Sequence, residues 1–397
     1  MIRTLAAILL ASSPFQEDLE KRRDALAARL EALRGLRFKT PLGIREGTRR
    51  EYAAYVLENA RRAYGGNLAA AEKGLKALGF FPNPLRLELA LTLHAGLGVK
   101  VFCSGGEIVL LDRHAGDEWI LNKMDLGLLD QHYTPEVAPT YDAQMAFAAL
   151  RLGDAEVVKH RLWHPEKFPP DYLTQLVRQV ETWERQESRA ASMVVPRFFV
   201  RSGDFPWRRG AVFALTLYSE GGFRRLDEAF RRPPVSTEQI LHPEKYLKGE
   251  PAVEIDCAPA QDLMASRGYR TAYRTVLGEL GAALFLETHL PRREPSGTGG
   301  GWGGDTLVVF EKDDAPPVIL WATEWDTEAQ AAAFEKEASE ALRAWGEAPP
   351  GTVRLAARKK TSVPLLLSAP VGLAEELLKE VWKGTRRNGY QRDRYGE

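Results

Sequence analysis

The order of apolar segments near the C-terminus constrains the fold more than any other feature of the chain. After a glycine-rich run, Gly297 to Gly304, the pattern predicts two strands, a helix, two strands and a helix. These six segments cover residues 305–310, 317–322, 327–345, 352–356, 362–367 and 371–382. With a helix predicted over residues 269–289, the order is typical of a small sheet with helices on one face. We therefore predict a C-terminal α+β region over residues 268–382.

The preceding residues, 14–267, are dominated by helical periodicity. Thr48, with Glu51 at capping-box spacing, is expected to begin one of these helices. Predicted helices cover residues 15–33, 48–64, 68–78, 85–94, 115–132, 140–161, 169–188, 213–219 and 222–230. Short strands are predicted over residues 36–38, 99–102 and 107–111, the last two as a hairpin, and a loop over residues 233–247. The whole chain is thus expected to have an α+β fold.

Composition excludes some partners. The chain has 397 residues, 44% of them hydrophobic, and its 54 Lys and Arg residues balance 54 Asp and Glu residues. A zero net charge gives no reason to expect nucleic acid as a partner. The basic segment over residues 383–397 can be read as a solvated terminus or as a contact for acidic partners or membrane surfaces. Outside the N-terminus no apolar run approaches transmembrane length, so no membrane span is predicted.

The first 13 residues resemble an export signal. Met1 to Arg3 supplies a positive charge, Thr4 to Ala11 is a short apolar run, and small residues follow. The alternative is that this run is the buried start of the first helix. An exported protein, in the periplasm, envelope or extracellular space, could join Cys103 and Cys257 as one disulfide. Two separate buried thiols are the other interpretation.

The chain has one pair of histidines at the spacing that places two imidazoles on one helical face. His160 and His164 are four residues apart, but Arg161 stands where a zinc peptidase has its general base. Pro165 disfavours a helical conformation at His164. We therefore expect the pair to lie across a helix end and not to bind metal.

One segment carries a specific resemblance. Arg232 to Tyr246 contains the run PPVSTEQILHPEKY, which resembles the signature of a group of bacterial zincin-like putative metallopeptidases. Asp130-Gln131-His132 resembles the DQH that follows the zinc helix in that group. Supporting similarity lies in Phe199 to Leu226, in Gly301 to Asp305 and in the run WATEWD at residues 321–326, so that the resemblance covers roughly residues 35–345. It implies a zincin-like, helix-rich core over residues 14–267.

The same resemblance implies that the zinc site has been lost. Members of the group read HELxHALQDQH across the zinc helix, and alignment on the DQH places Asn122, Lys123 and Leu126 at the first His, the Glu and the second His. Leu152 stands at the third ligand, the Glu of an EGDA motif. Zinc needs three or more N, O or S ligands, and leucine offers none. We therefore expect no cofactor, no metal and no peptidase activity.

Some polar residues of the resembling segments remain. Asp130, His132, Asp154, Glu238 and His242 could form a residual cleft, or could hold the fold through hydrogen bonds. The first function that the sequence suggests is an inactive metallopeptidase homologue that binds a peptide or envelope protein, or acts as a scaffold. The alternative is an active hydrolase with a non-standard metal or nucleophile. A groove between helices 115–132 and 140–161 would discriminate two roles: an open groove favours peptide binding, and one plugged by Leu126, Leu128 and Leu152 favours a structural role.

Overall fold

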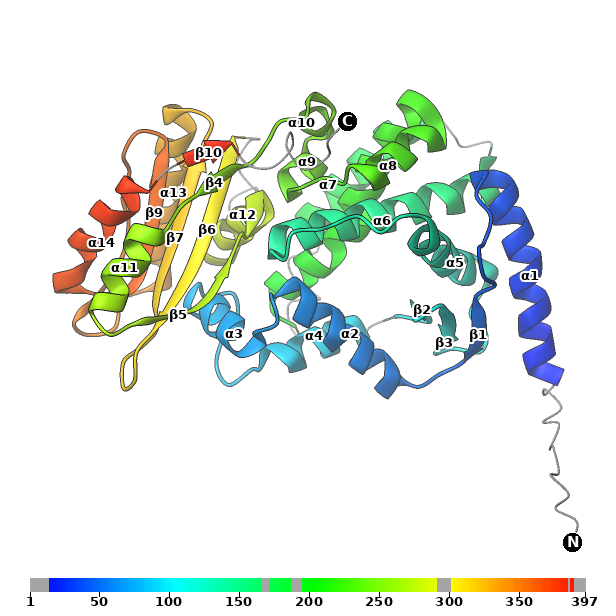
Figure 1. The fold of residues 1–397 in the computed structure, drawn as a ribbon, viewed down its shortest axis with the longest axis horizontal. Helices are drawn as coiled ribbons and strands as arrows, with labels where there is room; N and C mark the ends of the chain where they lie inside the picture. Colours follow the sequence, from blue (N-terminus) through cyan, green and yellow to red (C-terminus); the bar gives the residue numbers. More distant parts are fainter. Residues whose placement is uncertain are drawn as a thin grey trace, which may run out of the picture.

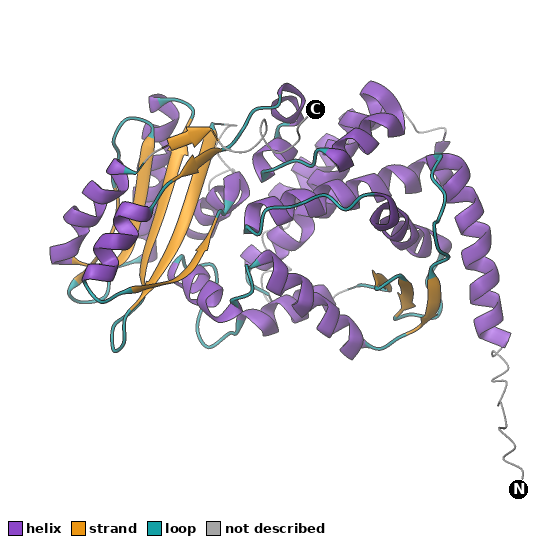
Figure 2. Cartoon of the chain, viewed as in Figure 1, coloured by secondary structure: helices purple, strands orange, loops and turns teal. Residues whose placement is uncertain are grey.

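The computed structural model describes residues 14–96, 98–165, 171–186, 195–290, 301–384 and 386–388. The predicted signal at residues 1–13 and most of the predicted basic tail lie outside these residues. The fold is α+β: a helix-rich region occupies one side of the molecule and a five-stranded sheet the other (Figures 1 and 2). No described helix is both long and apolar enough to cross a bilayer.

The helix-rich region contains ten helices and a small sheet within its described residues. The helices are α1 (Pro14–Arg34), α2 (Arg49–Ala63), α3 (Leu68–Ala77), α4 (Leu87–Gly96), α5 (Asp117–His132), α6 (Tyr141–Trp163), α7 (Asp171–Gln186), α8 (Arg197–Arg231), α9 (Thr237–Leu241) and α10 (Pro243–Lys248). The sheet has the order β1-β3-β2, with strands β1 (Gly43–Glu46), β2 (Val101–Ser104) and β3 (Glu107–Leu110). The strand predicted over residues 36–38 is wrong. The chain forms β1 further on, parallel to β3, and the Phe38 amide instead donates to the Glu31 carboxylate.

Several local signals in the sequence have the expected structure. Thr48 and Glu51 form a complete capping box at the start of α2. The hairpin between β2 and β3 is present, with Gly105 and Gly106 as its two-residue turn. The break predicted within α8 lies at Gly221 and Gly222, and Gly222 has φ 64° and ψ −155°, a conformation that essentially only glycine adopts.

Glycines bring the two longest helices together. A Cβ added to Gly153 in α6 would lie 2.0 Å from the carbonyl oxygen of Gly210 in α8, and one added to Gly210 would lie 2.2 Å from the carbonyl oxygen of Ala149. The two backbones are therefore in direct contact, which fixes α6 between α8 and α5.

The C-terminal sheet is antiparallel throughout, with the order β5-β6-β7-β9-β8. Its elements are β5 (Arg270–Thr275), α12 (Gly278–His289), β6 (Trp302–Glu311), β7 (Val318–Trp325), α13 (Glu328–Trp345), β8 (Thr352–Ala356), β9 (Ser362–Pro370) and α14 (Val371–Lys383). A second ladder pairs β4 (Val253–Ile255) with β10 (Arg386–Asn388), and α11 (Ala258–Ser266) lies between β4 and β5.

Two predictions for this region are wrong. The segment predicted as one helix over residues 269–289 begins with β5, because its first residues pair with β6. Helices also cover both faces of the sheet, not one: α12 and α13 pack on one face, and α11 and α14 on the other (Figure 1). Every residue of β6 and β7 is consequently buried, as expected for central strands covered on both sides.

The two regions share one hydrophobic core. The largest cluster of buried side chains joins Phe198 and Phe213 of α8 to Trp321 of β7 and Phe334 of α13. The predicted boundary between residues 267 and 268 falls between α11 and β5, although α11 packs on the sheet to which β5 belongs.

Of the two interpretations of the cysteines, the structure has the one with two separate thiols. Neither is in a disulfide: Cys103 packs beside the core of α1, α5 and the small sheet, and Cys257 lies in the core beneath α11 and α14. The possible disulfide does not form because the two residues belong to separate hydrophobic clusters. Burial raises the pKa of Cys103 to about 11, so this thiol stays protonated at neutral pH.

Candidate functional site

Helices α5 and α6 carry the four positions at which the resemblance places zinc chemistry. They run antiparallel, since Asn122 of α5 contacts Glu156 of α6 at 3.4 Å and Asp130, further along α5, contacts Arg151, earlier on α6, at 2.6 Å. Positions 126 and 152 consequently lie at the same level on neighbouring helices. The sequence alignment therefore assigned the four positions to one region of the structure.

A closed set of polar contacts occupies this region. The Lys123 ammonium donates to Asn122 Oδ1 at 2.9 Å, the Asn122 amide donates to Glu156 Oε1, and the Lys159 ammonium pairs with the same carboxylate. Both ammonium groups also lie over the Trp207 ring of α8, at 5.2 and 5.8 Å from its centroid. We call these five residues the lysine–tryptophan ring.

Apolar packing fills the rest of the interface. Every residue of α5 from Ile120 to Leu129 is buried except Lys123. Leu126 is 7% exposed, Leu128 is fully buried, and Leu152 is half-buried. The structure thus places Leu126 and Leu128 as the plugged arrangement requires, and Leu152 and Lys123 are partly exposed.

A buried charge cluster lies beneath the ring. Arg34, from the end of α1, pairs with Asp227 at 2.9 Å and lies 3.8 Å from Asp125 and 3.6 Å from Asp154. Among the described residues, none donates a hydrogen bond to either oxygen of Asp125 or Asp154. Burial and the adjacent Asp154 raise the pKa of Asp125 well above its usual range, and burial also raises the pKa of Asp154. Asp154, a candidate cleft residue, is instead part of this interior cluster.

The three side chains of the DQH motif hold neighbouring segments. Asp130 pairs with Arg151 through both carboxylate oxygens. Gln131 accepts from the backbone amides of residues 39 and 40, and His132 Nε2 lies 2.7 Å from the Arg37 carbonyl oxygen. The motif therefore fastens the segment before β1 to the end of α5.

The signature segment is not the loop that the sequence indicated, because it forms α9 and α10. Ser236 is the N-cap of α9, and its hydroxyl accepts from the Gln239 amide. The Thr237 amide and hydroxyl both donate to Asp142 Oδ1 of α6, at 2.8 and 2.5 Å. These caps, which depend on a residue 95 positions earlier in the chain, stabilise a helix of only five residues.

Asp305 makes a matching set of bonds at the start of α12. Its carboxylate accepts from the amides of Leu277 and Gly278, at 2.9 and 2.7 Å, and from the Trp302 indole at 3.1 Å. Burial raises the pKa of Asp305 to about 6 and that of Asp142 to about 7, although the hydrogen bonds oppose both shifts. We call Asp142, Thr237, Gly278 and Asp305 the signature cluster.

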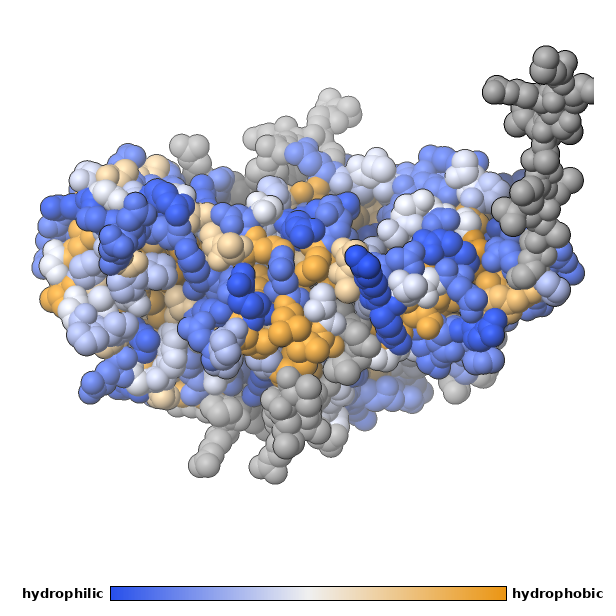
Figure 3. All heavy atoms as spheres, turned by 90° about the horizontal axis from the view of Figure 1, so that it is seen from below, coloured by the Kyte–Doolittle hydropathy of each residue, from blue (hydrophilic) through white to orange (hydrophobic). Residues whose placement is uncertain are grey.

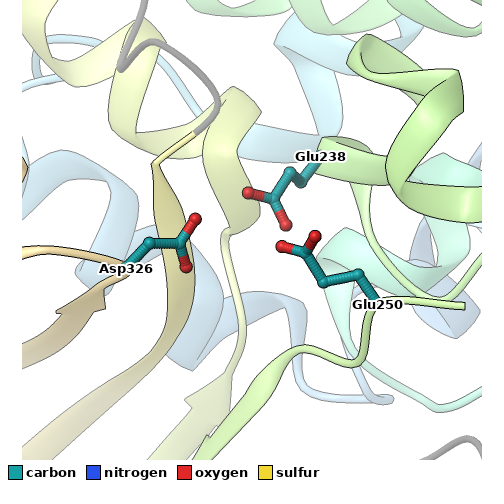
Figure 4. Close-up of side chains that lie close together, drawn as sticks. All are labelled: Glu238, Glu250 and Asp326. Carbon is teal, nitrogen blue, oxygen red and sulfur yellow. The ribbon is translucent and has the colours of Figure 1, made fainter. Parts of the chain in front are cut away.

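Three carboxylates near the signature cluster point towards one another (Figure 4). Among the described residues, Glu238, Glu250 and Asp326 are the one group of three side chains close enough to hold a metal ion. The Lys245 ammonium lies between them, at 2.7 Å from Glu238, 2.7 Å from Glu250 and 2.9 Å from Asp326. A lysine therefore occupies the position that a cation would take, and it joins α9 and α10 to the end of β7.

The pKa values of Glu238 and Lys245 are both raised, for different reasons. Burial, with the nearby carboxylates of Glu279 and Asp326, raises the pKa of Glu238 to about 8, although the Lys245 ammonium opposes this shift. Burial disfavours the charged form of Lys245, but those three carboxylates outweigh it and raise its pKa.

The histidines whose side chains the structure describes do not converge on a site. Burial disfavours the charged form of His242, but its bond to Glu279 at 3.1 Å outweighs this and raises its pKa. His132, His242 and Asp154 each contact different partners, so the residual cleft predicted from them is not assembled. His160 accepts or donates a bond with the Tyr172 hydroxyl at 2.6 Å, and α6 ends at Trp163, so His164 lies beyond the helix as expected.

The sequence alone did not identify the residues that organise the buried charge cluster, the signature cluster and the group of three carboxylates. These residues are Arg34, Asp125, Asp142, Asp305 and Lys245. The available signal was weak: Asp125 interrupts an otherwise apolar stretch of α5, and Asp305 opens an apolar strand. Charged residues at such positions are rarely fully buried unless they are paired.

Fold and site together define an α+β protein whose helical and sheet regions are joined by buried polar contacts. Comparison with protein families finds similarity to a domain of unknown function, DUF8575, over residues 267–364. The match covers about a quarter of the chain and runs from the end of α11 into β9. No curated protein and no solved structure matches the chain.

Proposed function

We propose that this chain is a catalytically inactive relative of zinc peptidases that works as an exported binding or scaffold protein. The observation that carries the proposal is the lysine–tryptophan ring. At the positions aligned with the zinc ligands and general base, Lys123 donates to Asn122, Asn122 donates to Glu156, and Leu126 is packed in the core.

The chemistry of these side chains opposes zinc binding. Two of the four positions are leucines, which offer no ligand atom, and a catalytic zinc site needs three protein ligands at about 2.0–2.3 Å. The Lys123 ammonium would repel a dication. The alternative, a hydrolase with a non-standard metal, is not favoured. In the described chain one group of three carboxylates could hold a metal ion, and the Lys245 ammonium lies between those carboxylates.

An exposed apolar surface supports a binding role. Leu89 and Leu93, one turn apart on α4, are 51% and 44% exposed. Figure 3 looks onto the side of the molecule where α2 and α4 lie and shows apolar residues gathered near its middle, between polar ones. Clustered apolar residues on a protein surface commonly mark interaction sites. Leu89→Ser with Leu93→Ser is expected to abolish retention of a partner from a native envelope extract, whereas Val371→Ser, an exposed apolar residue of α14, leaves it unchanged.

Metal analysis and proteolysis test the loss of activity directly. The purified protein is expected to contain no stoichiometric zinc and to leave casein intact. Stoichiometric zinc together with cleavage that EDTA abolishes would overturn the proposal.

A reconstituted variant tests the relationship to zinc peptidases. Asn122→His, Lys123→Glu, Leu126→His and Leu152→Glu, combined, restore the aligned residues and are expected to bind one zinc ion. The control restores all but Leu152→Glu and should bind zinc at least about 10-fold more weakly, since it has one ligand fewer. A combined variant that is folded by circular dichroism but takes up no zinc would contradict the proposed relationship.

A further inference from the structure

Lys123 is held unusually for a lysine in a helix interface. It is the one partly exposed residue in the buried stretch of α5. An ammonium has three N–H donors, and the described hydrogen-bond acceptor of Lys123 is a single neutral amide oxygen, that of Asn122. Its other close contact is the Trp207 ring. These surroundings stabilise the charged form poorly, while leaving part of the side chain reachable from outside.

Two neighbouring cations, Arg151 and Lys159, act in the same direction as burial, whereas Glu156 opposes it. The second ammonium on Trp207 is that of Lys159, which has Glu156 as its own counterion. Burial, the largest cause, lowers the pKa of Lys123 to about 8, with Glu156 and Cys103 opposing this shift and Arg151 and Lys159 adding to it. A desolvated lysine beside a second cation is the usual environment of a nucleophilic amine.

We propose that Lys123 is a carbonyl-reactive amine and that the lysine–tryptophan ring takes a small aldehyde or ketone as an imine. The Nζ lone pair adds to the carbonyl carbon, and the carbonyl oxygen takes up a proton while Nζ releases one. The resulting carbinolamine expels one water molecule as the C=N bond forms, so nothing is oxidised or reduced. The Lys159 ammonium, which also lies over Trp207, supplies the proton that the carbonyl oxygen takes up. Lys159 and its counterion Glu156 then take up the proton that Nζ releases.

This inference goes beyond the proposed function. Imine formation needs no zinc, so the metal content of the protein and the reactivity of Lys123 are separate questions. A lysine at this position cannot activate water as a zinc ion does. It can, however, hold a carbonyl compound through a covalent bond.

Reductive trapping tests the proposal. The full-length protein is treated with limiting propanal and cyanoborohydride at pH 7.5, and propylation of each lysine is followed by peptide mass mapping. Roughly a quarter of an amine with a pKa of about 8 is neutral at this pH, against roughly 0.1% for an ordinary lysine. Because lower basicity also reduces nucleophilicity, we expect Lys123 to react about 10-fold or more faster than the exposed Lys360.

Two variants serve as controls. Lys159→Met should slow the labelling of Lys123 several-fold and move the midpoint of its pH profile upward, because a neighbouring cation is removed. Lys123→Arg should leave the labelling of Lys360 unchanged. Labelling of Lys123 no faster than that of Lys360 in the native protein, or labelling with a midpoint near that of an ordinary lysine, would overturn the proposal.

Discussion

Two regions of the molecule bury carboxyl groups, and they satisfy them to different degrees. In the signature cluster, Asp142 and Asp305 each accept two or three short bonds from backbone and side-chain donors. In the cluster beneath the lysine–tryptophan ring, Arg34 approaches Asp125 and Asp154 no closer than 3.6 Å. Buried polar groups with all their hydrogen bonds make a structure more rigid, whereas buried polar groups that lack hydrogen bonds lower its stability. The comparison indicates that the first region holds the fold, and that the second tolerates change.

The largest effect is expected from Gly278→Ala in the signature cluster. Gly278 has φ +77°, and a Cβ there would lie 1.8 Å from Asp142 Oδ1 and 2.5 Å from Thr237 Oγ1. The change should cost about 4 kcal/mol of unfolding free energy or more, since strain and broken buried bonds add together. Gly66→Ala, also at positive φ (+83°) but with open space around it, should cost only about 1 kcal/mol. Equal losses in urea unfolding would contradict a tightly bonded cluster.

The same substitution in the two regions should have opposite consequences. In Asp305→Asn, one of the two backbone amides at the start of α12 would face an NH₂ group, at a cost of about 2–3 kcal/mol. In Asp125→Asn a neutral amide that can donate to Asp154 replaces a carboxyl group whose pKa is raised well above its usual range, so the change should be within about 1 kcal/mol of neutral. Chemical unfolding of both variants at pH 8 gives the comparison. A larger loss for Asp125→Asn would reverse the assignment of the two regions.

Lys245→Met should show that an ammonium takes the place of a cation. Without it, Glu238, Glu250 and Asp326 face one another uncompensated, at a cost of about 2 kcal/mol in this partly exposed site. Millimolar Ca²⁺ should recover part of the lost stability of this variant and leave the unsubstituted protein unchanged. Lys248→Met, at an exposed position of the same helix, is the matched control. No calcium response in thermal melts would show that the three carboxylates cannot converge on an ion.

The smallest effect concerns pH. Asp142 and Asp305 have folded pKa values raised to about 7 and 6, above about 3.9 in the unfolded chain. Their contribution to stability is therefore fully present below pH 4 and is lost as pH rises through 6 to 7. His242, whose pKa is also raised, acts with the same sign. The melting temperature should fall by roughly a few degrees between pH 5.5 and 8.

A variant separates Asp142 from the other groups. Asp142→Asn keeps an oxygen that can accept both Thr237 bonds but cannot ionise, so it should flatten the pH profile. A profile as steep as that of the unsubstituted protein would assign the pH dependence to other groups.

The sequence by itself determined the local structure. The capping box at Thr48, the two-glycine turn of the hairpin and the break at Gly222 depend on neighbours within a few residues, and so does the alternation of strands and helices after residue 301. The sequence also determined which side chains stand at the four aligned positions of α5 and α6, because an alignment depends on the residue types and not on the three-dimensional geometry.

Only the tertiary structure decided what those side chains contact. Asp142 meets Thr237 across 95 residues, Asp305 caps a helix that precedes it, and Lys245 enters a group of carboxylates that includes Asp326. No sequence periodicity links such distant partners, and the energies of their interactions depend on how deeply the structure buries them. The covering of both sheet faces and the separation of the two cysteines have the same cause, because the packing of distant segments selects them.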